Sequence, residues 1–92
     1  MLNSKGIKLA KRFRKNLDRR FEGNRSAERL IKERIKLFLL DRTNPLVNDH
    51  RLLGRLSNYR SFSITGDIRI IYMEYEEYYL FMDIGTHNQI YK

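Results

Sequence analysis

Residues 60–85 read RSFSITGDIRIIYMEYEEYYLFMDIG and carry the pattern of three β-strands joined by short turns. Over residues 60–65, large side chains alternate with serine and threonine, which is the period of a half-buried strand. Residues 68–74 and 78–84 are rich in β-branched and aromatic side chains, as strands usually are. Turn signals follow each strand at Gly66-Asp67, at Glu76-Glu77 and at Gly85. Short turns predict an antiparallel meander.

The preceding half of the chain has the period of helices. One apolar stripe recurs every four residues on a basic background and predicts a helix over about residues 10–22: Leu9, Phe13, Leu17 and Phe21. Gly23 provides a left-handed stop. Ser26 is the expected cap of a second helix that ends near Asp41. Its predicted buried face is Leu30, Ile31, Ile35, Phe38 and Leu39.

Together these elements predict one α+β domain over residues 1–92, in which an N-terminal two-helix hairpin packs on a curved antiparallel β-sheet. A short strand around residues 5–8 is expected to add an edge to the sheet. Residues 43–58 are expected to form a long loop, because they contain Pro45 and Gly54 and show no sustained period.

Charge is distributed unevenly along the chain. Residues 1–60 hold 17 Lys/Arg and 6 Asp/Glu, whereas residues 61–92 hold 2 and 5, so the two parts carry +11 and −3 and sum to the net +8. A positive field of this kind favours RNA or DNA as partner, although a solvated helix surface has the same composition.

Several function classes are excluded or disfavoured by composition. There is no cysteine, hence no disulfide and no thiolate metal site, and the two histidines lack metal-ligand spacing. No apolar run approaches the ~20 residues of a membrane span. We therefore expect a soluble cytoplasmic protein with no cofactor, no bound metal and no membrane contact.

The residues that could carry chemistry lie at the edges of the predicted sheet. His50 and His87 fall in a predicted loop and near the terminus, and loops on a rigid sheet often carry catalytic groups. Asp67 is either a turn former or a catalytic group. Arg69, in an otherwise apolar strand, either points to solvent or holds an anion. The tyrosines at 72, 75, 78 and 79 are interpreted as cross-strand packing rather than as a base-stacking platform.

From residue 49 onward the sequence resembles the RelE/ParE superfamily of toxins from toxin–antitoxin systems, and its YafQ branch most closely. Five ordered segments carry the resemblance: Asp49-His50-Arg51-Leu52-Leu53-Gly54, Tyr59-Arg60, Gly66-Asp67-Ile68-Arg69-Ile70-Ile71-Tyr72, Ile84-Gly85-Thr86-His87, and Tyr91. The resemblance implies a β-α-α-β-β-β fold, a cognate antitoxin, and ribosome-dependent cleavage of mRNA without a metal.

The resemblance also implies roles for individual residues. His50, Asp67 and His87 match catalytic positions of the YafQ branch. Arg51, Arg60, Arg69 and Tyr91 are the implied phosphate- or RNA-binding residues. Two departures stand out: Ser61 and Ser63 replace an acidic residue and a histidine of the branch, and Ile68 replaces a tryptophan.

Cleavage by the RNA's own 2′-hydroxyl needs a base, an acid and a positive charge for the phosphorane, and imidazole and guanidinium groups supply these. Which histidine is acid and which is base stays open. Two alternatives stay open as well: a ParE-like toxin that poisons gyrase, and a nucleic-acid-binding module without catalysis.

Overall fold

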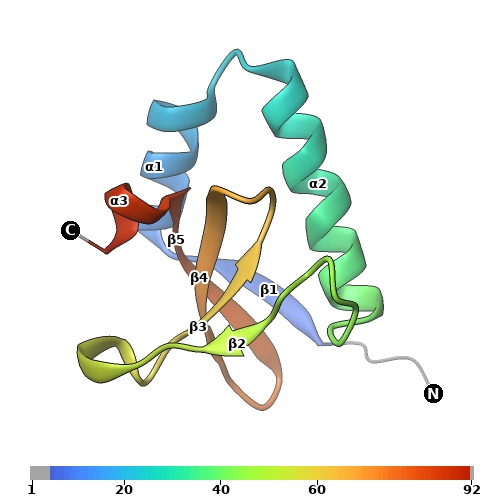
Figure 1. Ribbon diagram of the computed structural model, residues 1–92, viewed down its shortest axis with the longest axis vertical. Helices are drawn as coiled ribbons and strands as arrows, with labels where there is room; N and C mark the ends of the chain where they lie inside the picture. Colours follow the sequence, from blue (N-terminus) through green and yellow to red (C-terminus); the bar gives the residue numbers. More distant parts are fainter. Residues whose placement is uncertain (1–4, 92) are drawn as a thin grey trace.

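The computed structural model describes residues 5–91. Its sheet has five strands in the order β1-β5-β4-β3-β2. They are β1 (Gly6–Leu9), β2 (His50–Arg51), β3 (Arg60–Ser63), β4 (Ile68–Glu74) and β5 (Tyr78–Thr86). Two long helices, α1 (Lys11–Phe21) and α2 (Arg25–Leu40), connect β1 to the rest, and a short α3 (His87–Ile90) follows β5. Figure 1 shows α3 beside α1, with α2 on the other side of the molecule.

The predicted α+β class, the helix hairpin and the three-stranded meander are confirmed. The wholly antiparallel sheet is not, because β1 runs parallel to β5, with Gly6 opposite Tyr78. Parallel pairing requires a crossover connection between the two strands, and here the two long helices and the strands β2, β3 and β4 lie between them in the chain. The segment expected to be a loop contains β2 and a 3-10 turn, η1 (Gly54–Leu56).

Both helices owe their position to aromatic side chains that pack on one face of the sheet. Phe13 of α1 and Phe38 of α2 are buried, and Phe38 stacks on Phe62 of β3 with ring centroids 4.3 Å apart. The predicted cross-strand tyrosine packing is present in the core, where the rings of Tyr72 and Tyr79 meet edge to face at 5.7 Å. Leu30 and Leu39 are about two-fifths exposed, at 40% and 37%, so the predicted buried face of α2 was too broad.

Local signals at the helix ends behave partly as expected. Gly23 has φ +83° and ends the turn after α1, as its sequence position predicts. The cap of α2 is Asn24 rather than Ser26: its side-chain oxygen accepts a hydrogen bond from the Ala27 amide at 3.0 Å. Asparagine caps a helix at least as well as serine, so the helix is capped two residues earlier than predicted.

Gly85 does not end the last strand, as its sequence position suggested, but lies inside β5 and is buried. A Cβ atom at this position would lie 2.5 Å from Arg20 Nη1 and 2.7 Å from Gln89 Oε1. Glycine is therefore required by close packing between β5, α1 and α3, and not by a turn.

Candidate functional site

We call the face of the sheet opposite Phe38 and Phe62 the outer face, and α1 reaches it at β5, where Asn16 and Arg20 bind Asp83. His50 lies opposite Ser61, which in turn lies opposite Ile71, while Ser63 lies opposite Arg69. Residues directly opposite one another in an antiparallel ladder share a face. The outer face therefore carries, in order from the β2 edge, the residues His50, Ser61, Ser63, Arg69 and Ile71.

Two buried polar atoms on the outer face have no hydrogen-bond partner among the described residues. They are Arg69 Nε and the hydroxyl of Ser61, a residue with 0% exposure. Arg69 lies between Ser63 on one side and Gly85 on the other. Because buried polar groups are normally paired, unpaired ones in a native fold point to a ligand or an ordered water. A guanidinium group beside hydroxyls has the chemistry to hold a phosphate.

Asp67 and His87 lie at the same end of neighbouring strands. Ile68 is opposite Thr86, so each of the two residues is one step beyond this pair. His87 is the first residue of α3, whose N-terminus is closed by a capping box between Thr86 and Gln89. Its imidazole ring is 4.5 Å from the ring of Tyr91, centroid to centroid, and both residues retain exposed surface. The structure thus brings His87 and Tyr91 into contact and places Asp67 at the same end of the sheet.

His50 reaches the outer face from the opposite edge of the sheet. Through Ser61, His50 lies in register with Ile71 of β4. Ile71 is four residues from Asp67, which corresponds to about 13 Å along an extended chain. His50 Nδ1 is 2.8 Å from the carbonyl oxygen of Asn48. A carbonyl only accepts, so Nδ1 carries the proton in this contact and Nε2 is left for a substrate. His50 and the pair Asp67/His87 therefore flank Arg69 from two sides.

Arg51 and Arg60 are opposite one another and point away from the outer face, because strand residues alternate between faces. The Arg60 guanidinium forms an ion pair with the Asp49 carboxylate at 2.9 Å. The Tyr72 hydroxyl donates a hydrogen bond to the same carboxylate. The structure does not bring these two predicted RNA-binding arginines to the face that carries His50.

Asp49 belongs to a larger ionic cluster at this edge of the sheet. Arg42 binds Asp49 at 2.8 Å through Nε and Glu74 at 2.8 Å through Nη2, and Lys5 binds Glu74 at 2.9 Å. Burial raises the pKa of Asp49, but hydrogen bonds from two guanidinium groups and a phenol outweigh it and hold the pKa below its ordinary value. The hydrogen bond from Arg42 lowers the pKa of Glu74 to about 2.

A cavity of about 250 Å³ lies between η1 and α3, next to the outer face. Its lining residues are Leu53, Arg55, Leu56, Ile90 and Tyr91. Leu53 is 87% exposed, and Arg55 is exposed as well. Neither Leu53 nor Arg55 was among the candidate site residues; Leu53 belongs to the segment that carries the resemblance, and Arg55 follows Gly54. Tyr91 therefore lies between His87 and this cavity, which is also lined by the cation Arg55.

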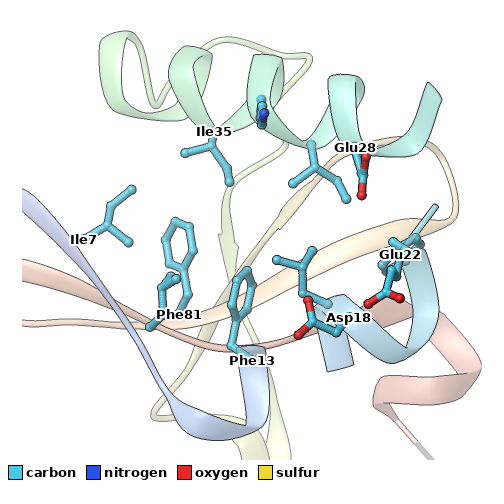
Figure 2. A pocket seen from close by; sticks show the side chains of 12 residues that line it. Ile7, Phe13, Asp18, Glu22, Glu28, Ile35 and Phe81 are labelled. Atoms are coloured by element: carbon cyan, nitrogen blue, oxygen red, sulfur yellow. The ribbon is translucent and has the colours of Figure 1, made fainter. Parts of the chain in front are cut away.

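A separate apolar groove lies between α1 and α2, above β1 and β5, and has a volume of about 380 Å³ (Figure 2). Its lining is mostly apolar: Ile7, Leu9, Phe13, Leu17, Phe21, Ile31, Ile35 and Phe81. The charged lining residues are three carboxylates and Lys32, which together carry a net charge of −2. Asp18, Glu22 and Glu28 lie near one another at one end of the groove, and Ile7 lies toward the other end (Figure 2). This end is an acidic patch on the otherwise basic N-terminal part of the chain.

Between residues 5 and 91, no helix is long and apolar enough to cross a membrane. Over the same range, no three side chains among His, Asp and Glu are grouped as ligands of a metal ion.

The sequence matches the profile of a family described as bacterial toxin of type II toxin–antitoxin system, YafQ, over residues 5–92. No curated protein matched the chain. The fold is similar to that of YafQ from E. coli strain BL21(DE3), with a TM-score of 0.71, 18% identity, and coverage of 97% of this chain and 100% of the other.

Two further solved structures share the fold. One is the E. coli DinJ-YafQ toxin-antitoxin complex, with a TM-score of 0.70, 20% identity, and coverage of 96% of this chain and 98% of the other. The other is a metal-bound toxin from Helicobacter pylori, with a TM-score of 0.69, 20% identity, and coverage of 98% and 99%.

Proposed function

Because the chain belongs to the YafQ family of bacterial toxins from type II toxin–antitoxin systems, we propose that it is a ribonuclease that cleaves mRNA on the ribosome. The observation that carries this proposal is the outer face. There, the Nε of Arg69, which has no partner among residues 5–91, lies between His50 at one edge of the sheet and Asp67 and His87 at one end of it. A protein that only binds nucleic acid has no need for imidazole groups on both sides of a phosphate site.

The proposed substrate phosphate binds the guanidinium group of Arg69, beside the hydroxyl of Ser63, which lies opposite Arg69 in the sheet. The neutral Nε2 of His50 takes the proton of the ribose 2′-hydroxyl, whose oxygen attacks the phosphorus. Protonated His87 then gives its proton to the departing 5′ oxygen. The carboxylate of Asp67, at the same end of the sheet, stabilises the positive charge of that imidazolium. An RNA with sulfur as the leaving 5′ atom should restore cleavage by His87→Ala but not by His50→Ala, since a thiolate leaves without an acid.

RNA contacts outside the reacting phosphate are proposed for two surfaces. Tyr91 packs against His87 and borders the depression that contains Arg55, so a base could stack there next to the scissile bond. The exposed cations of α1, such as Arg14 and Lys15, supply a nonspecific attraction to ribosomal RNA. No step of this mechanism uses a metal ion. Treating the purified toxin with a chelator before it meets ribosomes should therefore leave the cleavage rate unchanged.

The proposal is tested by expressing the chain under tight control and mapping 5′ ends of host mRNA. New ends should appear within coding regions as growth stops. His50→Ala and His87→Ala should each abolish the new ends, whereas the matched control Asn88→Ala, exposed on α3 beside His87, should retain them. Growth arrest without new mRNA ends would favour a gyrase poison or a plain binder, and full activity of both histidine variants would refute the proposed chemistry.

A related structure contains an antitoxin, DinJ, bound to YafQ. We propose that this chain also has an antitoxin partner, and that an amphipathic helix of that partner occupies the groove between α1 and α2. The apolar walls fit the apolar stripe of a helix. The carboxylates of Asp18, Glu22 and Glu28 at one end fit a basic terminus of that helix (Figure 2).

Reversing charge at the acidic end of the groove tests this arrangement. The double variant Glu22→Lys/Glu28→Lys should remain toxic but resist neutralisation by co-expressed cognate antitoxin. Glu33→Lys, an exposed substitution on α2 outside the groove, serves as control and should still be neutralised. Equal neutralisation of both variants would place the antitoxin on another surface.

A further inference from the structure

The ionic cluster at the β2 edge lies directly beside His50 in sequence, on the opposite side of the sheet. Asp49 directs its carboxylate toward Arg42, Arg60 and Tyr72, and its side chain is 7% exposed. The next residue, His50, points to the outer face, because successive residues of an extended chain point to opposite faces. A two-residue strand has few ladder hydrogen bonds of its own, so something else must hold it in register.

We propose that Asp49 is a positioning residue: its ion pairs with Arg42 and Arg60 anchor the segment that presents His50, and the Asn48 carbonyl then determines which ring nitrogen of His50 faces the substrate. The inference rests on the proposed function for the importance of His50 in cleavage. The anchoring itself is a property of the fold that can be measured without RNA.

Three contacts converge on the Asp49 carboxylate from three different elements. Arg42 comes from the loop after α2, Arg60 from β3, and Tyr72 from β4. Arg42 is itself held by both carboxylate oxygens of Glu74, at 2.8 Å each. Anchoring from several directions fixes the backbone at residue 49 far better than one contact would.

Asn48 also contributes to the position of the His50 ring. It is the one non-glycine residue among those described that has a positive φ, at +49°. Asparagine tolerates this left-handed conformation better than most residues. In this conformation its carbonyl oxygen lies 2.8 Å from His50 Nδ1. Such a contact fixes the tautomer of a histidine by occupying one nitrogen, so that the other is presented to the reaction.

The test measures the ring of His50 directly, by ¹⁵N NMR of the purified full-length toxin at a pH where the ring is neutral. In the wild type, His50 should be the tautomer with Nδ1 protonated. Tyr72→Phe removes one donor to Asp49 and keeps the ring, Asp49→Asn removes the charge, and Asn48→Val disfavours positive φ. Each variant should shift His50 toward a mixture of tautomers and slow cleavage by about 10-fold or more. Asn48→Gly should behave as the wild type.

Thermal unfolding and the ring signals of His87 show whether each variant is folded, and Tyr72→Phe provides a mild change if Asp49→Asn fails to fold. The proposal is overturned if folded Tyr72→Phe and Asn48→Val both keep the wild-type His50 tautomer. If the tautomer shifts but cleavage by His50→Ala equals that of the wild type, then the anchoring is correct and the catalytic role of His50 is wrong. The two claims therefore fail separately.

Discussion

Arg69 and Arg60 show why single residues of the same type take different roles in this sheet. Both lie on strands, but Arg60 has its charge neutralised by Asp49, whereas Arg69 keeps a buried Nε without a partner among the described residues. A buried Nε without a partner lowers the stability of the free protein, and a bound anion would supply that partner. From the sequence, both arginines were equally good candidates for phosphate binding, because their partners are distant in the chain.

Replacing Arg69 should therefore affect catalysis far more than folding. We expect Arg69→Ala to slow cleavage of ribosome-bound mRNA by about 100-fold, and Arg69→Lys by about 10-fold, because lysine keeps the charge but not the planar fork. The free energy of unfolding should change by less than about 1 kcal/mol, since no partner loses a hydrogen bond. Single-turnover cleavage and urea denaturation measure the two effects.

Arg14→Ala is the matched control, because Arg14 is exposed on α1 away from the outer face. It should weaken binding to ribosomes slightly and leave the rate of the bound complex unchanged. A wild-type rate for Arg69→Ala would remove Arg69 from the proposed mechanism.

Short elements are where sequence and structure differ most. The meander and both long helices follow from periods of two and about four over many residues, so they were predictable. β2 and α3 have 2 and 4 residues, too few for any period, and they form because long-range contacts hold them. His50 and His87 lie on these two short elements. The resemblance suggested both histidines as site residues, but their positions relative to Arg69 could not be predicted from the sequence.

Substituting Gly85 tests how α3 is held. A methyl group at Gly85 would collide with the ends of Arg20 and Gln89, whose side chains bind the Ile84 carbonyl and the Thr86 amide. We expect Gly85→Ala to lower the free energy of unfolding by about 1 to 2 kcal/mol, because the capping box of α3 opens. Cleavage should fall as well, because α3 carries His87 and packs Tyr91.

Gly66→Ala is the control for this substitution, since nothing lies within 4 Å of a Cβ at that turn and the residue does not have a positive φ. It should leave both stability and the amide exchange of α3 near wild-type values. Unchanged hydrogen exchange in Gly85→Ala would mean that the close contacts are relieved without disturbing α3.

The free energy of unfolding of the whole molecule should depend on pH through the ionic cluster that contains Asp49 and Glu74. The folded pKa of Glu74 is about 2, below its ordinary value of 4.5, mainly because of the hydrogen bond from Arg42. A carboxylate whose pKa is lower in the folded than in the unfolded state stabilises the fold at pH values above the unfolded pKa. This contribution is lost as the pH falls from about 5 to about 2. Since Glu74 is exposed, we discount the effect for solvent and expect about 1 kcal/mol.

Glu74→Gln should thus be less stable than the wild type by that amount at pH 7, and the two curves should converge as the pH approaches 2. Urea denaturation at a series of pH values measures this. Glu76→Gln, on the neighbouring turn, is the control. A constant difference between Glu74→Gln and the wild type at all pH values would show that the ionised carboxylate is not what stabilises the cluster.

At the scale of the whole molecule, the charge division seen in the sequence is also a spatial one. Of the N-terminal +11, α1 and α2 carry +8, from 11 Lys/Arg and 3 Asp/Glu, whereas His50, Arg69 and His87 of the proposed reaction lie on β2, β4 and α3. Composition favours a polyanionic partner, which stays a prediction. It could not predict which face would meet that partner, because this depends on how the strands pair.

The central claim is that the outer face directs the 2′-hydroxyl of mRNA against its own phosphate. The most direct measurement is the chemistry of the ends that the purified toxin produces on a ribosome programmed with a defined mRNA. The account predicts a 2′,3′-cyclic phosphate and a 5′-hydroxyl, and no cleavage when the nucleotide before the cut has a 2′-deoxyribose. A product with a 3′-hydroxyl and a 5′-phosphate, or unimpeded cleavage at the 2′-deoxy position, would contradict it.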